Sequence, residues 1–342
     1  MIKEAIAKLV EKQNLTITET EGVMSEIMSG QATPAQIGAF LTALRMKGET
    51  AAEIAGCARV MRANARRVQP KRTDVVDTCG TGGDAAGTFN ISTTVAFVAA
   101  GAGLAVAKHG NRSVSSKCGS ADLMGALGVK IDLTPEQVAR CIDEIGIGFL
   151  FAPAFHPAMK HATPVRQEIG LRTIFNVLGP LTSPAWAKRQ LVGVYSAHLV
   201  PTIAEVLRSM GTEHAFVVHG AGGLDELSTI GTNEVAEIKD GEIKVFDLDP
   251  RKLGLPRTAL SDLAGGTLEE NAAITRAILG GEKGPKRDTV LLNAAAVLVA
   301  GEKARDFSEG IALAAEAIDG GKALEKVDAL IRMSQSFSRE AG

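Results

Sequence analysis

The chain has no long hydrophobic run, because no apolar stretch reaches about eighteen residues without a glycine or a charged side chain. That absence argues against a membrane span, and the charged, amphipathic residues 1–10 argue against a signal peptide. Basic residues are not in excess either, since 37 Lys and Arg are balanced by 39 Asp and Glu. A nucleic-acid-binding domain usually carries a basic surplus. We therefore expect a soluble cytoplasmic protein without membrane or nucleic-acid partners.

Cysteine is scarce, and its positions form no recognisable pattern. The four cysteines, at 57, 79, 118 and 141, lack the close spacing of metal ligands, and a reducing cytoplasm would keep them as thiols. Cys79 and Cys118 fall in glycine-rich segments, where a thiol could be sensitive to oxidation. Small buried side chains are the simpler interpretation.

Residues 1–70 carry the signals of short helices. Three capping boxes, in which a threonine precedes Glu or Gln by three positions, each predict a helix start: Thr18 with Glu21, Thr33 with Gln36, and Thr50 with Glu53. Apolar residues recur behind each box at helical spacing. We expect a small antiparallel bundle that ends at the linker 66–70. Such a bundle needs a partner surface, either a second subunit or the larger domain of the same chain.

After the linker, strand and helix patterns alternate. Short apolar runs predict strands over 75–76, 104–107, 149–151, 191–194 and 215–218, with helices between them such as 91–100 and 135–145, the latter opened by Thr134 with Gln137. This alternation predicts a mostly parallel central sheet flanked by helices. Residues 235–246 predict a hairpin, and alanine-rich stretches over 269–279, 288–299 and 308–318 predict closing helices. The expected α/β architecture has a helical domain over 1–70, joined by about 167–188, and a larger domain over 71–342.

Two glycine-rich loops follow the first two strands of this pattern. In the first, Gly80, Gly82 and Gly83 would let backbone N–H groups approach an anion near the start of a helix. In the second, Lys108 is expected just past the end of its strand, and Arg112 adds another cation. Because the carboxyl ends of parallel strands share one edge of a sheet, the two loops predict a pocket for a polyanion.

At this point the sequence resembles a known family, the anthranilate phosphoribosyltransferases. The resemblance rests on Asp-Thr-Cys-Gly-Thr-Gly-Gly-Asp at 77–84, Asn-Ile-Ser-Thr at 90–93 and Lys-His-Gly-Asn-Arg at 108–112, and it continues through 156–181 and 219–226. It covers nearly the whole chain in order. It implies transfer of the phosphoribosyl group of phosphoribosyl pyrophosphate to the amine of anthranilate in tryptophan biosynthesis. It also implies a homodimer formed through the helical domain.

The resemblance implies that both loops bind phosphoribosyl pyrophosphate. The implied residues are Gly80, Gly83, Asp84, Thr88, Asn90, Ile91, Ser92, Thr93, Lys108, His109, Gly110, Asn111, Arg112, Ser113, Val114, Ser115, Ser116 and Ser120. Pyrophosphate leaves as a highly charged anion, so its stabilisation is expected to be the largest catalytic effect.

Three carboxylates, Asp84, Asp225 and Glu226, would repel a polyanion unless a cation lay between them. Mg²⁺ binds through one or two carboxylates together with ligand phosphates and water, which resolves the conflict. The resemblance assigns Ser92, Asp225 and Glu226 to two Mg²⁺ ions per subunit. Taken alone, an Asp-Glu dipeptide is more often a solvated pair on a loop, and only the order of the surrounding motifs favours the metal site.

The expected acceptor contacts centre on Arg166, whose guanidinium fork matches the carboxylate of anthranilate. On spacing alone, an ordinary surface arginine of a helix is the favoured interpretation of Arg166, and the match to the family motif is what favours the functional one. Gly80 and Asn111 are implied as further anthranilate contacts, and His109, His156 and Pro180 are weaker candidates for the pocket wall. No residue is assigned as a general base, because an aromatic amine is already neutral near pH 7 and positioning can supply much of the rate.

Two other functions compete with this interpretation. Pyrimidine-nucleoside phosphorylases have a similar second loop, but their first loop lacks the Gly-Thr-Gly-Gly-Asp order found at 80–84. A non-catalytic nucleic-acid-binding protein of this fold would need a basic face and would have lost site residues, whereas this chain is near neutral and keeps the whole set.

Overall fold

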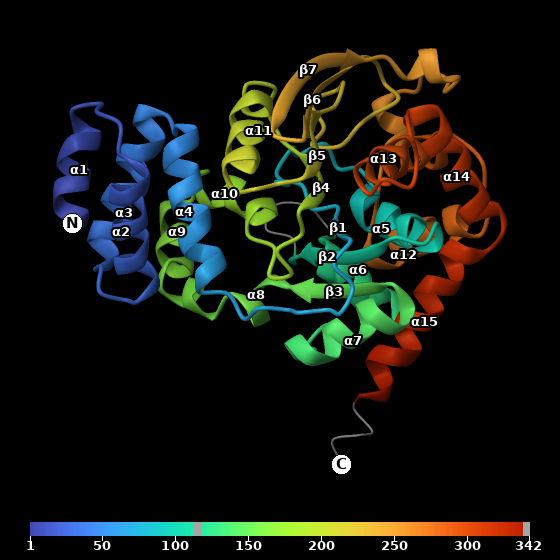
Figure 1. The fold of residues 1–342 in the computed structure, drawn as a ribbon, viewed down its shortest axis with the longest axis horizontal. Helices are drawn as coiled ribbons and strands as arrows, with labels where there is room; N and C mark the ends of the chain where they lie inside the picture. Colours follow the sequence, from blue (N-terminus) through green and yellow to red (C-terminus); the bar gives the residue numbers. More distant parts are fainter. Residues whose placement is uncertain (113–117, 338–342) are drawn as a thin grey trace.

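The computed structural model describes residues 1–112 and 118–337. Figure 1 shows a small helical lobe beside a larger part built around a sheet. Four helices open the chain: α1 (Ile2–Val10), α2 (Ile17–Met28), α3 (Pro34–Lys47) and α4 (Ala51–Ala63). Two later helices, α9 (Thr163–Ile169) and α10 (Phe175–Leu178), return to this lobe and pack on α3 and α4 respectively.

Two of the three capping boxes predicted in the bundle are confirmed, at Thr33 with Gln36 and Thr50 with Glu53. The third prediction, Thr18 with Glu21, is wrong, because the box that starts α2 is formed by Thr16 with Glu19 and Thr18 lies inside the helix. The sequence fits the Thr-x-x-Glu pattern at both positions. The earlier one is used because the chain is held just before it, where the Leu15 N–H donates to Glu53 at 2.9 Å.

The sheet has seven strands in the order β3-β2-β1-β4-β5-β6-β7. The first five are parallel: β1 (Val75–Asp77), β2 (Ala105–Gly110), β3 (Ile147–Phe151), β4 (Arg189–Gly193) and β5 (His214–His219). The predicted hairpin forms β6 (Asn233–Lys239) and β7 (Glu242–Leu248), and it extends the same sheet by antiparallel pairing with β5. Its two-residue turn, Asp240-Gly241, has both φ angles positive, as a tight hairpin requires.

Lys108 does not lie past the end of its strand, as the sequence had suggested. Pairing between β2 and β3 continues through Gly110 and Phe151, so Lys108 is inside β2 and its side chain is buried. The Nζ atom donates to the backbone oxygen of His109 at 2.9 Å. The residues from Lys108 to Gly110 pair in register with Phe149 to Phe151, so the ladder with β3 extends β2 beyond its apolar run.

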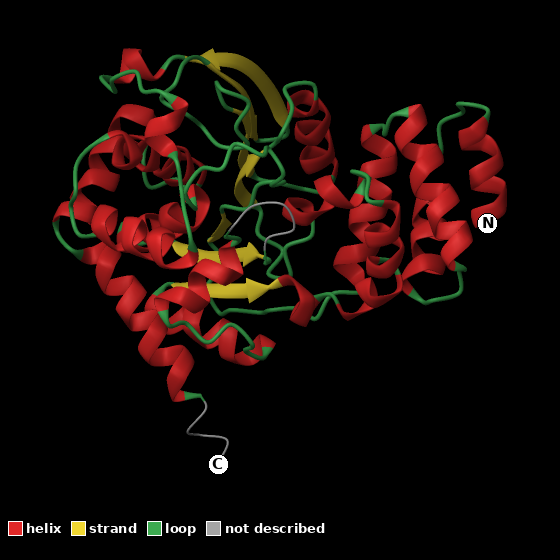
Figure 2. Ribbon diagram, turned by 180° about the vertical axis from the view of Figure 1, so that it is seen from behind, coloured by secondary structure: helices red, strands yellow, loops and turns green. Residues whose placement is uncertain are grey.

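Helices cover both faces of the sheet (Figures 1 and 2). The helices after the bundle, apart from α9 and α10, are α5 (Ile91–Gly101), α6 (Ser120–Leu127), α7 (Pro135–Ile145), α8 (Ala152–Phe155), α11 (Leu199–Ser209), α12 (Leu268–Leu279), α13 (Pro285–Ala300), α14 (Phe307–Asp319) and α15 (Lys322–Ser336). The three predicted closing helices correspond to α12, α13 and α14. No helix in the described residues is both long and apolar enough to span a membrane.

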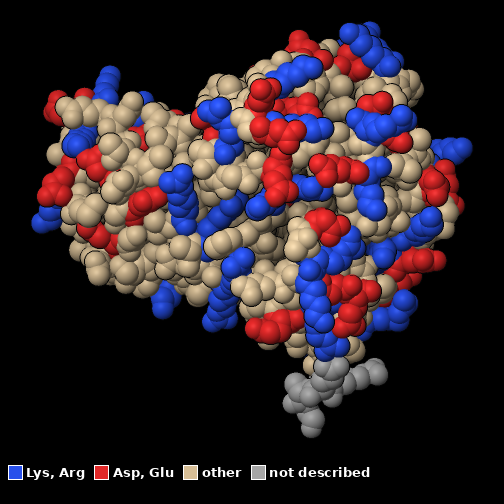
Figure 3. All heavy atoms as spheres, viewed as in Figure 1, with Lys and Arg blue, Asp and Glu red and all other residues tan. Residues whose placement is uncertain are grey.

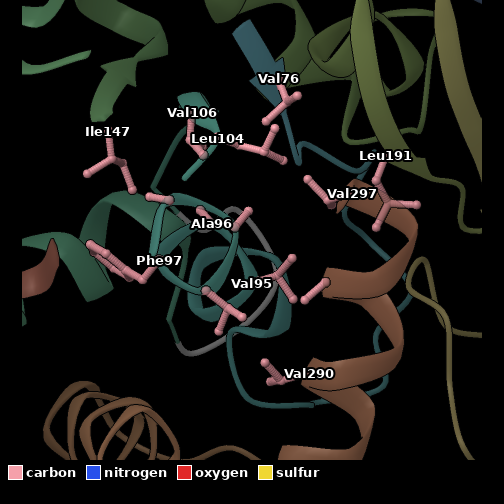
Figure 4. Close-up of a cluster of buried hydrophobic side chains, with 14 of the residues drawn as sticks. Val76, Val95, Ala96, Phe97, Leu104, Val106, Ile147, Leu191, Val290 and Val297 are labelled. Carbon is pink, nitrogen blue, oxygen red and sulfur yellow. The ribbon is translucent and has the colours of Figure 1, made fainter. Parts of the chain in front are cut away.

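Alternation along the strands divides the core into two clusters. On β5, Phe216 and Val218 point into the cluster that contains α5 and α13, whereas Ala215 and Val217 join a second cluster with α11 and the N-terminal bundle. Figure 4 shows side chains of α5 and α13 meeting in the first cluster. The bundle therefore packs on the larger part of its own chain, through α4 and α11.

Candidate functional site

The first glycine-rich loop leaves β1 and crosses the carboxyl end of β4. The Thr81 N–H donates to the Gly193 carbonyl at 2.8 Å, and the Tyr195 N–H donates to Thr81 Oγ1 at 3.1 Å. Gly82 and Gly83 have φ angles of +67° and +79°, which favour glycine over other residues. The loop thus turns as the sequence predicted, and it is anchored to a neighbouring strand.

The loop leads into the N-terminus of α5. Asn90 occupies the N-cap position, but its side chain makes no capping bond and instead donates to the Cys118 carbonyl at 3.0 Å. Thr78 Oγ1 donates to the Ser92 carbonyl at 3.0 Å. Asn90 Oδ1 and Thr93 Oγ1 are buried without a hydrogen-bond partner in the described part of the chain. Since buried polar atoms are normally paired, both atoms suit contact with a polar ligand.

The predicted acidic residues come together at this helix start. Asp225 Oδ2 accepts from the Gly82 N–H at 2.5 Å, and Glu226 Oε1 accepts from the Ser92 N–H at 3.2 Å. Asp84 Oδ2 accepts from the Asp225 N–H at 3.4 Å. Loops that are about 140 residues apart in the sequence therefore share one set of hydrogen bonds.

This crowding raises the pKa values of the buried carboxyls. Burial, and then the negative charge of Asp84, raises the pKa of Asp225 to about 7. Burial, and then the charge of Asp225, raises the pKa of Glu226 well above its ordinary value. A nearby cation would stabilise the ionised form of both carboxyls, because its charge would offset the cost of desolvation and the mutual repulsion. The donor set of oxygens fits Mg²⁺.

The carboxylates would not make a complete metal cage without other ligands. Within residues 1–112 and 118–337, no three His, Cys, Asp or Glu side chains converge closely enough to hold a metal ion by themselves. A Mg²⁺ ion at this place would therefore need further ligands, such as phosphate oxygens and water.

Glycines allow the acidic pair, Asp225 and Glu226, to lie directly on the strand ends. A Cβ at Gly193 would overlap the carbonyl oxygen of Asp225, and one at Gly220 would overlap that of Glu226. A Cβ at Gly80 would lie 3.0 Å from Asp225 Oδ2. The backbone of the acidic pair is therefore seated where only glycine fits beneath it.

The second loop is closed by its own contacts. Ser120 Oγ accepts from the Asn111 N–H at 3.1 Å, and Gly110 packs so closely on Ser120 that a side chain there would overlap it. Arg112 forms an ion pair with Asp122 at 3.0 Å. The predicted residues Ser113, Val114, Ser115 and Ser116 lie outside the described residues.

Thr88, farther along the first loop, forms an isolated antiparallel bridge with Ala264.

The two loops are tied together by Asp77, a residue to which the sequence analysis gave no role of its own. The N–H groups of Thr78 and His109 donate to Asp77 Oδ1 at 2.7 and 3.1 Å. The side chain is fully buried at the end of β1, and burial raises its pKa to about 6 even though Lys108 acts in the opposite direction. A polar residue at the end of a buried strand was the available signal in the sequence.

Of the proposed acceptor residues, Arg166 lies on the segment that returns to the helical bundle, whereas Gly80 and Asn111 lie in the two glycine-rich loops. Arg166, on α9, has its guanidinium 5.0 Å from the centre of the Phe175 ring, and burial lowers its pKa. It makes no ion pair with any residue that the structure describes. A guanidinium in that position suits an incoming carboxylate.

The two candidate wall histidines face each other. The rings of His109 and His156 are 5.4 Å apart, and His109 Nδ1 lies 3.2 Å from the Gly179 carbonyl, next to Pro180. Burial lowers the pKa of His156 to about 4 and that of His109 well below its ordinary value. Both rings are therefore neutral at pH 7.

Arg172 is a second residue that the sequence analysis did not identify. Its Nη2 donates to the Gly83 carbonyl, and its guanidinium lies 4.7 Å from the centre of the Tyr195 ring. A basic residue in the returning segment was visible in the sequence, but no local pattern links position 172 to position 83.

On the face shown in Figure 3, basic and acidic side chains are interspersed, and no single-sign surface that would suit nucleic acid stands out there.

Comparison with known proteins agrees with this geometry. Residues 3–65 match the helical bundle domain of a glycosyl transferase family, and residues 72–324 match its α/β domain. The anthranilate phosphoribosyltransferase of Dehalococcoides mccartyi is 57% identical over 340 residues, which are 99% of both chains. That of Desulforamulus reducens is 55% identical over 337 residues, which are 98% of both.

Solved structures extend the agreement to the whole fold. The anthranilate phosphoribosyltransferase of Thermus thermophilus superposes with a TM-score of 0.92 at 44% identity, covering 97% of this chain and 99% of its own. The Saccharomyces cerevisiae enzyme, solved in complex with PRPP (phosphoribosyl pyrophosphate) and Mg, superposes with a TM-score of 0.90 at 32% identity, covering 98% of both chains. By its two matched domains, its full-length relatives and its fold, this chain belongs to the anthranilate phosphoribosyltransferase family.

Proposed function

We propose that this protein transfers the phosphoribosyl group of 5-phosphoribosyl 1-pyrophosphate to the amine of anthranilate. The products are N-(5-phosphoribosyl)anthranilate and pyrophosphate, and the reaction is a step of L-tryptophan biosynthesis. The observation that carries the proposal is the meeting of Asp84, Asp225 and Glu226 with a glycine-rich loop and the start of α5. Carboxylates gathered at an anion-binding turn are consistent with a metal-bound polyphosphate.

We assign the diphosphate and ribose to the two loops. The residues are Gly80, Gly83, Asp84, Thr88, the segment 90–93, the segment 108–116 and Ser120. Ser92, Asp225 and Glu226 would hold two Mg²⁺ ions, which when bound neutralise the charge that develops on the leaving pyrophosphate. The yeast relative has been solved with PRPP and Mg, which supports this assignment.

We assign anthranilate to Arg166, Asn111 and the backbone of Gly80. The Arg166 guanidinium would bind the carboxylate and so orient the amine toward the ribose. The yeast relative has also been solved with 4-fluoroanthranilate. The neutral rings of His109 and His156 would pack beside the acceptor without taking its proton, so no general base is assigned.

The same proposal includes the organisation of the molecule. Residues 1–70, joined by about 167–188, would form one domain and 71–342 the other, with two subunits associating through the helical domain. The packing of α9 on α3 and of α10 on α4 supports the first assignment. We expect the enzyme to act in the cytoplasm.

The test is a fluorescence assay with purified protein, phosphoribosyl pyrophosphate, Mg²⁺ and anthranilate, in which anthranilate fluorescence is lost on transfer. Arg166→Ala should raise KM for anthranilate about 10- to 100-fold, since a charge-assisted pair is lost, with little change in KM for the other substrate. Arg276→Ala is the matched control, because Arg276 is exposed and pairs with Asp328 on α15. No loss of fluorescence by the folded parent enzyme would overturn the proposal, and phosphorolysis of a pyrimidine nucleoside would then be tried.

A further inference from the structure

Asn293 lies in the middle of α13 and is fully buried. Its side-chain amide binds both backbone groups of Leu227. The Leu227 N–H donates to Asn293 Oδ1 at 2.9 Å, and Asn293 Nδ2 donates to the Leu227 carbonyl at 2.7 Å. The same Nδ2 donates to the Thr289 carbonyl one turn earlier, at 2.9 Å.

Leu227 directly follows the acidic pair in the sequence. When the N–H and the carbonyl of one residue are both held, its peptide planes are fixed in position and direction. The amide of asparagine carries an acceptor oxygen and a donor nitrogen side by side, so it can bind both groups of one residue at once. The identity of residue 293 is therefore matched to the backbone next to Glu226.

A second contact from α13 acts on the same loop. Thr289 Oγ1 lies 3.0 Å from Thr229 Oγ1, which is in turn 2.8 Å from Thr258 Oγ1. Thr289 and Asn293 are one helical turn apart, so they face the loop from the same side of α13. Residues 227 and 229 are thereby held against α13, a helix in which every residue from Thr289 to Ala300 is buried.

The acidic pair is also held by the elements on which it lies. The close fits at Gly193 and Gly220 leave its backbone carbonyls no room to move toward the strands. The Gly82 and Ser92 N–H groups bind its carboxylates. Movement away from these donors is the freedom that remains, and the bonds of Asn293 to Leu227 oppose it.

We propose that Asn293 is a positioning residue for Asp225 and Glu226, holding Leu227 so that both carboxylates face Ser92 and the first glycine-rich loop. This positioning role rests on the proposed function, because the acidic pair is there assigned to the metal that binds with phosphoribosyl pyrophosphate. Outer residues that orient metal ligands commonly contribute about 10- to 100-fold to metal affinity. A loss of that order is expected when the amide is removed.

The experiment measures Mn²⁺ binding by electron paramagnetic resonance, with phosphoribosyl pyrophosphate present, together with steady-state kinetics. Asn293→Leu, which removes both bonds, should weaken Mn²⁺ binding about 10- to 100-fold and raise KM for phosphoribosyl pyrophosphate, leaving KM for anthranilate nearly unchanged. Asn293→Asp keeps an acceptor but loses both donated bonds, so it should also be impaired. Thr289→Val removes only the contact with Thr229 and should show a smaller loss in the same direction.

Two further variants separate the possible outcomes. Ser334→Ala removes a buried hydroxyl on α15 that accepts from the Lys130 N–H at 3.1 Å and has no bond to the acidic pair or to Leu227, and it should lower thermal stability without changing Mn²⁺ binding. Glu226→Gln should abolish tight Mn²⁺ binding. If Glu226→Gln does so while the Asn293 and Thr289 variants bind Mn²⁺ like the parent, the positioning role is overturned and the metal site stands. If Glu226→Gln also binds like the parent, the proposed metal site itself is wrong.

Discussion

The Cα of Gly193, at the end of β4, lies directly against the backbone carbonyl of Asp225, so that a side chain at position 193 would overlap that oxygen. Gly193 also accepts the Thr81 N–H through its own carbonyl, at 2.8 Å. One residue therefore supports both the first glycine-rich loop and the acidic pair. Its φ angle is not in the left-handed region, so the requirement for glycine there is one of space.

We expect Gly193→Ala to displace the acidic pair. Overpacking of this kind costs about 1–3 kcal/mol in stability, and kcat/KM should fall at least about tenfold, because a shift of roughly 1 Å in a site can cost that much or more. Urea unfolding and the fluorescence assay measure the two effects. Gly125→Ala is the control: Gly125 lies on α6 with open space around its Cα, and the change should stabilise the helix slightly. Equal activity in the two variants would contradict the steric argument.

Asp77 should make the stability of the protein depend on pH. Its pKa in the folded state is about 6, compared with an ordinary value of 3.8, so folding favours the protonated form. The contribution of Asp77 is therefore most favourable below about pH 4 and declines as the pH rises to about 6, by up to about 3 kcal/mol. Asparagine does not titrate. Relative to the parent, Asp77→Asn should gain free energy of unfolding by up to that amount as the pH rises from about 4 to about 7.

Urea titrations of the two proteins at several pH values measure this difference. Parallel curves for parent and variant would show that Asp77 does not titrate in this range. Activity is a separate readout, because the amide oxygen introduced by Asp77→Asn could still accept the two N–H bonds that join the loops.

The four cysteines should be unreactive in the native protein. Burial raises the pKa of Cys79 and Cys141 to about 12 and that of Cys118 to about 11, and it raises the pKa of Cys57 as well. Because the thiolate is the reactive form, iodoacetamide at about pH 8 should label the folded chain slowly, with Cys118 first, and label all four positions in urea. Mass spectrometry follows the labelling. Rapid native labelling of Cys79 would instead favour the oxidation-sensitive interpretation of the loops.

The two threonines that compete for the start of α2 offer a matched comparison. Thr16→Ala should lower the free energy of unfolding by about 1 kcal/mol, since it removes a side-chain cap. Thr18→Ala should change it little or raise it slightly, because Thr18 is exposed inside the helix and alanine is a better helix former. Urea unfolding of both variants measures the difference, and a larger loss at Thr18 would contradict the observed cap.

Local patterns were enough for most of the fold. Capping boxes at Thr33, Thr50 and Thr134 each start the helix that they predicted, and the apolar runs after the linker became β1 to β5. Boundaries were less certain, because hydrogen bonding to a neighbouring strand can lengthen a strand beyond its apolar run. For that reason the sequence placed Lys108 just past the end of β2, whereas it lies inside the strand. The cap of α2 was predicted at Thr18 instead of Thr16, because no local pattern shows that Glu53 binds the backbone just before α2.

The types of residue at the site could be read from the sequence, because glycine-rich turns after strands and adjacent carboxylates are visible in the order of residues. The tertiary structure alone decided which of them meet. The bond from the Gly82 N–H to Asp225 spans 143 positions, the bonds between Asn293 and Leu227 span 66, and that from the His109 N–H to Asp77 spans 32. Contacts at such separations depend on strand order and helix packing, which bring together residues that share no local pattern.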